Sequence, residues 1–96
     1  MEEERKTRLV SAVETLETVH PGQRLTMRNP VSELRGFYAR RRPRGDDISV
    51  FMLGPVTVIS VTLDVHGEEH VLMMSSTGNL GWRGRFWVEG LMKEVP

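Results

Sequence analysis

Cysteine is absent from all 96 residues of the chain. A disulfide framework and a thiolate metal site are therefore excluded, so packing or association with a second copy must hold the fold together. Long hydrophobic runs are missing as well, because the most apolar stretch, residues 48–65, is interrupted by Gly54-Pro55 and by several Ser and Thr residues. A membrane helix needs about 20 apolar residues in succession. We therefore expect no membrane partner.

The start of the chain also lacks the features of a secretory signal. It reads MEEERKTRL, which is acidic and polar, whereas a signal needs a basic start and an apolar run of about 7 to 15 residues. Hydrophobic residues make up 39% of the chain and charged residues 27%, as in ordinary folded domains. We expect a single cytoplasmic domain over residues 1–96, since a chain of this length supports one modest core.

Net charge is zero, but the charges are unevenly distributed. Residues 24–44 contain seven arginines and one acid, Glu33, which is a local balance of +6. Arginine binds phosphate in a bidentate manner and stacks on rings, so such a segment can attract an anionic ligand. The alternative interpretation is that a GC-rich genome favours Arg codons.

The apolar spacing near the N-terminus predicts an amphipathic helix over residues 3–19, ended by His20-Pro21-Gly22. Its stripe consists of Leu9, Ala12, Val13, Leu16 and Val19. Because only this face is apolar, we expect the stripe to cover a sheet. The alternative is a helix that binds a partner.

The rest of the chain is rich in strand patterns. Alternation of apolar and polar residues predicts strands over 24–28, 56–65, 70–75 and 80–88, with a bulge or a bend near Val58-Ile59. Residues 31–42 are ambiguous between helix and strand, and we favour a strand that forms a hairpin with 48–53. The tail, 89–96, allows a short helical turn, which Gly90 disfavours. The predicted fold class is α+β: an N-terminal amphipathic helix on a curled antiparallel sheet of five or six short strands, either open or closed as a small barrel.

No residue set identifies an enzyme, and we predict neither catalytic residues, nor a metal, nor a cofactor. His66 to His70 spell H-x-x-E-H, a zinc peptidase motif, but that motif requires a helix and here it lies between two β-rich segments. We interpret it as a solvated polar turn. On a hairpin the two histidines could face each other, which leaves adventitious metal binding as an alternative.

The arginine-rich hairpin is the main functional candidate. Rings beside basic groups are typical of sequence-tolerant binders of single-stranded nucleic acid, because cations hold the phosphates while rings stack on the bases. The predicted site residues are Arg40, Arg41, Arg42, Arg44, Tyr38, Arg83, Arg85 and Trp87, and the last three should share one face of the final strand. The expected partner is RNA or single-stranded DNA.

The alternative function is protein–protein interaction. The chain contains six methionines and two tryptophans, many adaptable apolar groups for a small core. If some of them are exposed, they could cover a homodimer interface or a partner protein. We accordingly expect a non-enzymatic binding protein, and a homodimer.

Overall fold

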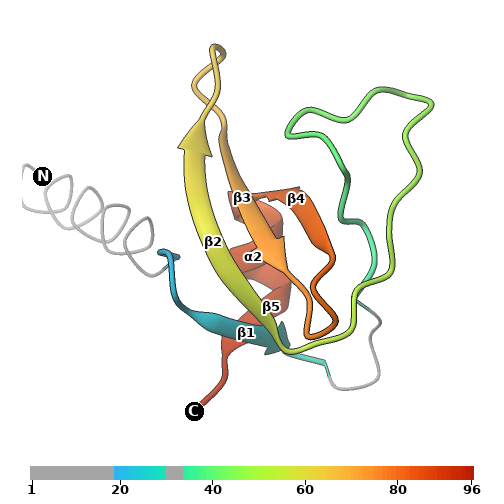
Figure 1. Cartoon of the computed structure of the whole chain (residues 1–96). Coiled ribbons are helices and arrows are strands. Elements are labelled where there is room, and N and C mark those ends of the chain that lie inside the picture. The colour runs from blue at the N-terminus through green and yellow to red at the C-terminus, as the bar shows by residue number, and fades with distance from the viewer. Residues whose placement is uncertain (1–18, 30–33) are drawn as a thin grey trace, which may run out of the picture.

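A computed structural model describes residues 19–29 and 34–96 of the chain. In these parts, five strands form one antiparallel sheet in the order β4-β3-β2-β1-β5 (Figure 1). The strands are β1 (Arg24–Met27), β2 (Val56–Leu63), β3 (Glu69–Met74), β4 (Leu80–Gly84) and β5 (Met92–Glu94). A short helix, α2 (Arg85–Leu91), connects β4 to β5 and lies against one face of the sheet.

The α+β class is confirmed in its coarse form, since an antiparallel sheet packs with a helix. The alternative of a closed barrel is wrong, because the sheet is open, with β4 and β5 as its two end strands. The predicted N-terminal helix lies outside the described residues, apart from its last apolar position. That position, Val19, is buried in the core.

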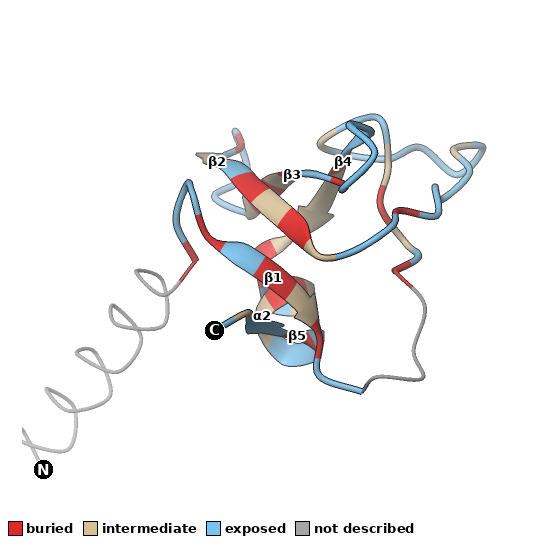
Figure 2. Cartoon of the chain, turned by 60° about the horizontal axis from the view of Figure 1, so that its bottom comes forward, coloured by how far each residue is buried: buried red, intermediate tan, exposed pale blue. Residues whose placement is uncertain are grey.

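The first predicted strand is confirmed as β1. Leu25 and Met27 are buried whereas Arg24 is exposed, as the sequence alternation predicts (Figure 2). β1 pairs with β2 on one side and with β5 on the other. The predicted helical turn in the tail is present as residues 89–91, the last turn of α2, but the tail then continues as the strand β5, which was not predicted. A three-residue strand is too short for its alternation to be recognised in a sequence.

The predicted bulge in β2 is also confirmed. The pairing of β2 with β3 shifts register between Val58 and Ser60, which returns Val61 to the face that carries Val58. β3 and β4 continue the antiparallel pairing, with Val71 opposite Val61 and Arg83 opposite Val71. The predicted strands 56–65 and 70–75 are therefore paired with each other, and β4 pairs with β3 in turn.

The predicted hairpin of 31–42 with 48–53 is confirmed only in part: the two segments meet in antiparallel orientation, but neither forms a regular strand in its described residues. Within the described part of these segments the pairing is limited to a bridge between Phe37 and Val50 and to a hydrogen bond from the Met52 amide to the Leu34 carbonyl, 2.9 Å long. Side-chain burial holds the two arms instead, because Phe37 and Met52 are completely buried. Both arms are irregular loops pinned to the core.

The predicted strand over 80–88 is wrong in its second half. β4 ends at Gly84, and Arg85 begins α2, where Arg85, Val88 and then Met92 are buried at helical spacing. Glycine has no side chain to contribute to a strand, which accounts for the change of element at this point.

One core joins the sheet, α2 and the two loop arms. Its buried hydrophobic residues are Val19, Leu25, Met27, Leu34, Phe37, Met52, Val56, Val58, Val71, Met73, Val88 and Met92. Four methionines are among them, so the exposed methionine surface expected for protein interaction is largely absent from the described residues. No helix in the described segments has the length and apolar character that crossing a membrane requires.

Candidate nucleic-acid interface

Residues 39–49, here called the arginine loop, project from the molecule beside β4 (Figure 1). Arg40, Arg42 and Arg44 are exposed, and Arg41 is half-buried. A turn closes the tip: the Arg44 amide donates to the Asp47 carboxylate at 2.6 Å, and the Asp47 amide donates to the Arg44 carbonyl at 3.0 Å. The four predicted tip arginines therefore lie together on one projecting loop.

Tyr38 fixes one end of the loop to the sheet. Its backbone exchanges two hydrogen bonds with Trp82 of β4, of 3.0 and 2.7 Å, which extends the sheet by a single bridge. The adjacent Phe37 packs edge-on against Trp87, with ring centroids 5.4 Å apart. The base of the arginine loop is thus held by backbone pairing and by an aromatic contact.

Tyr38, Arg83 and Trp87 form a stack beside the loop, here called the ring stack. The Arg83 guanidinium carbon lies 4.6 Å from the centre of the Trp87 ring and 5.4 Å from that of Tyr38, both within cation–π range. Gly36 permits this approach, because an added Cβ there would lie 3.2 Å from the same guanidinium carbon. The fold therefore brings Tyr38 beside two predicted site residues that are distant from it in sequence, Arg83 of β4 and Trp87 of α2.

Arg85 does not join them. It is 9% exposed, pairs with Glu69 of β3 and donates to Glu89 one helical turn later at 2.6 Å. The expectation that Arg83, Arg85 and Trp87 share one strand face is wrong, because α2 begins at Arg85. A buried guanidinium with two carboxylate partners connects helix to sheet and is not available to a ligand.

Two of the tip arginines face acidic groups. An Arg42 nitrogen lies 3.5 Å from the Asp64 carboxylate and another lies 3.6 Å from that of Glu68. Arg40 is 3.8 Å from Asp47, a loose and exposed contact. The exposed Arg40–Asp47 pair contributes little to stability, but all of these acids reduce the local positive field. The charge of the loop is therefore lower than the sequence segment alone indicates.

The acids that face Arg42 belong to a compact cluster at the turn between β2 and β3. The Asp64 and His70 side chains are buried and in contact, with His70 Nε2 2.9 Å from Asp64 Oδ2. The other Asp64 oxygen accepts the backbone amides of His66 and Glu68 at 2.8 and 3.0 Å. We refer to Asp64, Glu68 and His70 as the acid–histidine cluster.

The Asp64 carboxyl is ionised at neutral pH. Burial alone would raise its pKa, but the hydrogen bonds from His70 and from the Glu68 and His66 amides, together with the charge of Arg42, outweigh burial and lower the pKa to about 2. An ionised carboxylate only accepts hydrogen bonds, so the ring of His70 is the donor in their contact.

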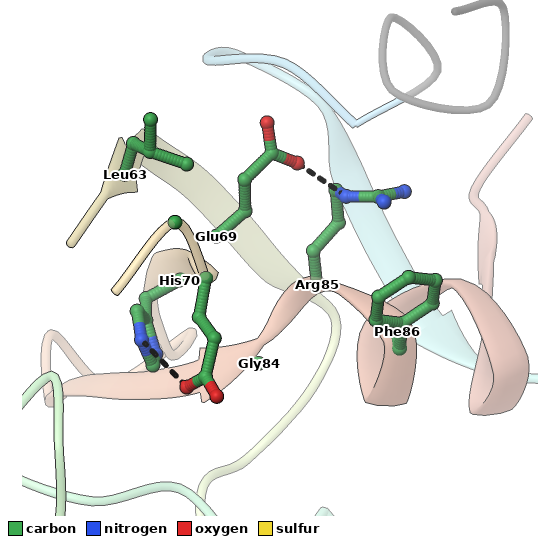
Figure 3. A pocket seen from close by; sticks show the side chains of 8 residues that line it. Leu63, Glu69, His70, Gly84, Arg85 and Phe86 are labelled. Atoms are coloured by element: carbon green, nitrogen blue, oxygen red, sulfur yellow. Dashed lines mark ion pairs between the residues drawn. The ribbon is translucent and has the colours of Figure 1, made fainter. Parts of the chain in front are cut away.

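A surface pocket of about 500 Å³ lies beside the cluster (Figure 3). His70 lies on one side of it, while Glu69 and Arg85 form an ion pair on the other. Glu68 also lines the pocket. The opposite directions of His70 and Glu69 follow from the alternation of side chains along a strand. Leu63 and Phe86 add exposed apolar walls.

Sequence reasoning missed Asp64 and the apolar edge of the loop. Asp64 falls within the predicted strand 56–65, where its side chain has no particular role. An Asp just before a turn is, however, a typical acceptor for the backbone amides of that turn. Ile48, Phe51 and Leu53 were assigned to a strand, where one face would be buried, but all three are exposed. Comparison of the chain with protein-family models, with curated proteins and with solved structures found no match.

Proposed function

We propose that the protein binds single-stranded RNA or DNA through the arginine loop. Arg40, Arg41 and Arg44 contact phosphates, and Tyr38 offers its ring to a base. The observation that carries the proposal is the position of these arginines on a projecting loop whose base adjoins the ring stack. Single-strand binders combine the same two parts, guanidiniums for the backbone and rings for the bases.

The predicted arginines have different roles in this proposal, because each guanidinium has different neighbours. Arg83 lies between Tyr38 and Trp87, so it supports the rings and is not a phosphate ligand in this proposal. Arg42 is held by Asp64 and Glu68, and Arg85 is buried. Among the described residues, the side chains of Arg41 and Arg44 form no ion pair with an acid, so they are the best placed to receive phosphate.

The test is fluorescence anisotropy of a labelled mixed-sequence oligonucleotide, as RNA and as single-stranded DNA, at several salt concentrations. If three arginines neutralise three phosphates, the slope of log affinity against log salt is about −2. Replacing Arg40, Arg41 and Arg44 with Gln should remove most of the binding and flatten the slope. Tyr38→Leu should weaken binding by about 1 to 3 kcal/mol, because a base loses its stacking partner.

The matched control removes positive charge at the other end of the sheet. Arg24 and Lys93 are exposed on β1 and β5, whereas the arginine loop lies beside β4. The double variant Arg24→Gln/Lys93→Gln should retain the affinity and the salt slope. Absence of binding at low salt, or equal losses in the loop and control variants, would reject the arginine loop as a nucleic-acid site.

Protein–protein interaction is the second candidate function. It is favoured by the exposed apolar residues that follow the arginines, namely Ile48 at 85%, Phe51 at 49% and Leu53 at 49% exposure. Aromatic residues and arginine are enriched in protein interfaces, and Phe51 follows the arginine loop closely in the chain. We propose a second copy of the chain as the partner, since a small cysteine-free domain gains buried apolar area by pairing.

A further inference from the structure

The acid–histidine cluster has the composition and spacing of a cation site. One oxygen of Asp64, one of Glu68 and one ring nitrogen of His70 all lie within 4.8 Å of one another. His70 Nε2 is 2.9 Å from the Asp64 oxygen and 3.9 Å from the Glu68 oxygen. Tetrahedral zinc, with bonds of about 2.0 to 2.1 Å, separates its ligand atoms by roughly 3.3 Å. These two distances bracket this value, and the exposed Glu68 side chain is the ligand that has to adjust its position.

We propose that Asp64, Glu68 and His70 bind a divalent transition-metal ion of the zinc class, which takes the place of the Arg42 guanidinium. Two carboxylates and an imidazole are a donor set that zinc accepts, with water completing the coordination.

Arg42 marks where positive charge is favoured. Its guanidinium contacts both carboxylates, yet its own side chain is 47% exposed, so it can leave for solvent at small cost. Glu68 is 60% exposed and the neighbouring pocket opens beside it, which gives an ion a path to the buried Asp64 and His70. A doubly charged ion satisfies the two carboxylates more completely than one guanidinium does.

Hydrogen bonds from the backbone hold the Asp64 carboxylate in place. Because the second Asp64 oxygen accepts the His66 and Glu68 amides, the carboxylate is already oriented with one oxygen towards His70. Such supporting hydrogen bonds strengthen metal binding. On binding, His70 Nε2 gives up its proton to solvent or to Nδ1, and its lone pair forms the bond to the metal.

The experiment is isothermal titration calorimetry of the full chain with Zn²⁺ alone, and Co²⁺ absorption as a report of coordination geometry. Glu68→Gln and His70→Gln should each weaken Zn²⁺ binding by at least about tenfold. Arg42→Gln should tighten it, because the competing cation is removed. No nucleic acid is present, so the outcome is independent of the proposed function.

The controls separate this cluster from exposed histidines and from general effects of loop charge. His20→Gln removes an exposed histidine elsewhere, and Arg44→Gln removes a loop charge whose guanidinium pairs with none of the cluster acids. Both should leave the Zn²⁺ affinity unchanged. Because the Glu68 side chain is exposed, Glu68→Gln keeps the fold. If His70→Gln fails to fold, the Zn²⁺ affinity of Glu68→Gln alone tests the proposal. Zn²⁺ affinity that is undetectable into the millimolar range, or indifferent to Glu68→Gln, overturns the proposal.

Discussion

The arginines of this protein differ in what surrounds each guanidinium. Arg85 is buried between two carboxylates, Arg83 lies between two rings, and Arg42 faces an acidic turn. The planar, weakly hydrated guanidinium tolerates all three environments, which an ammonium group would not. Residue type alone therefore cannot distinguish an arginine that binds a ligand from one that holds the fold.

At the residue scale, Gly81 is the site where an added methyl group has the clearest effect. A Cβ there would lie 2.7 Å from Phe37 Cβ and 3.0 Å from Met52 Sδ, and both side chains are completely buried. Gly81→Ala should lower the free energy of unfolding by about 1 to 3 kcal/mol, as expected for overpacking. Urea denaturation measures the change. Gly45→Ala, where no atom lies within 4 Å, is the control, and equal midpoints for the two variants would contradict this packing.

At the element scale, the connection after β4 determines how the C-terminal part is arranged. α2 crosses one face of the sheet and returns the chain as β5 beside β1, the first strand of the part of the chain that the structure describes. Helix α2 is only seven residues long, so its stability comes from tertiary contacts rather than from helix propensity. Arg85 supplies one of these contacts, through Glu69 of β3.

We therefore expect Arg85→Ala to destabilise the protein by roughly 3 kcal/mol, because it leaves Glu69 and Glu89 partly buried without their cation. Arg85→Lys should recover part of the loss, since one ammonium group cannot reproduce both contacts of the guanidinium. Thermal unfolding, monitored by circular dichroism, measures the stability of both variants. Arg24→Ala, at an exposed position on β1, should change stability by less than about 0.5 kcal/mol. A melting temperature unaffected by Arg85→Ala would show that the ion pairs do not hold the helix.

At the scale of the whole molecule, the open sheet and its long loop leave apolar side chains in solvent. Three exposed apolar residues lie close together in the chain: Ile48 near the end of the arginine loop, and Phe51 and Leu53 shortly after it. Exposed apolar groups close together are typical of interaction sites. The same segment thus presents cations and apolar groups, the two parts on which our two candidate functions depend.

Self-association is the prediction at this scale. Light scattering after size-exclusion chromatography should give the mass of a dimer at micromolar concentrations, and Phe51→Asp should shift it to a monomer, because a buried charge without a partner opposes association. Phe86→Asp is the matched control, since Phe86 is 81% exposed on α2. A monomer across the whole concentration series would exclude the homodimer. Dissociation by Phe86→Asp alone would move the interface to α2.

The sequence by itself determined the elements whose pattern is local. Alternation predicted β1, β2 with its bulge, and β3, because the side chains of a strand repeat every second residue whatever the strand pairs with. The arginines of the arginine loop and the neighbouring Tyr38 can likewise be recognised from the sequence, because they lie within a few residues of one another. These features depend only on residues close together in the chain.

Only the tertiary structure decided the rest. Residues 80–88 alternate like a strand, but Arg85 meets Glu69 across the sheet, and burial of Val88 and Met92 selects the helical spacing. The contact of Arg42 with Asp64 and Glu68 joins segments distant in sequence, and so does the contact of Arg83 with Tyr38. No local pattern encodes such contacts, because they depend on which surfaces the folded chain brings together.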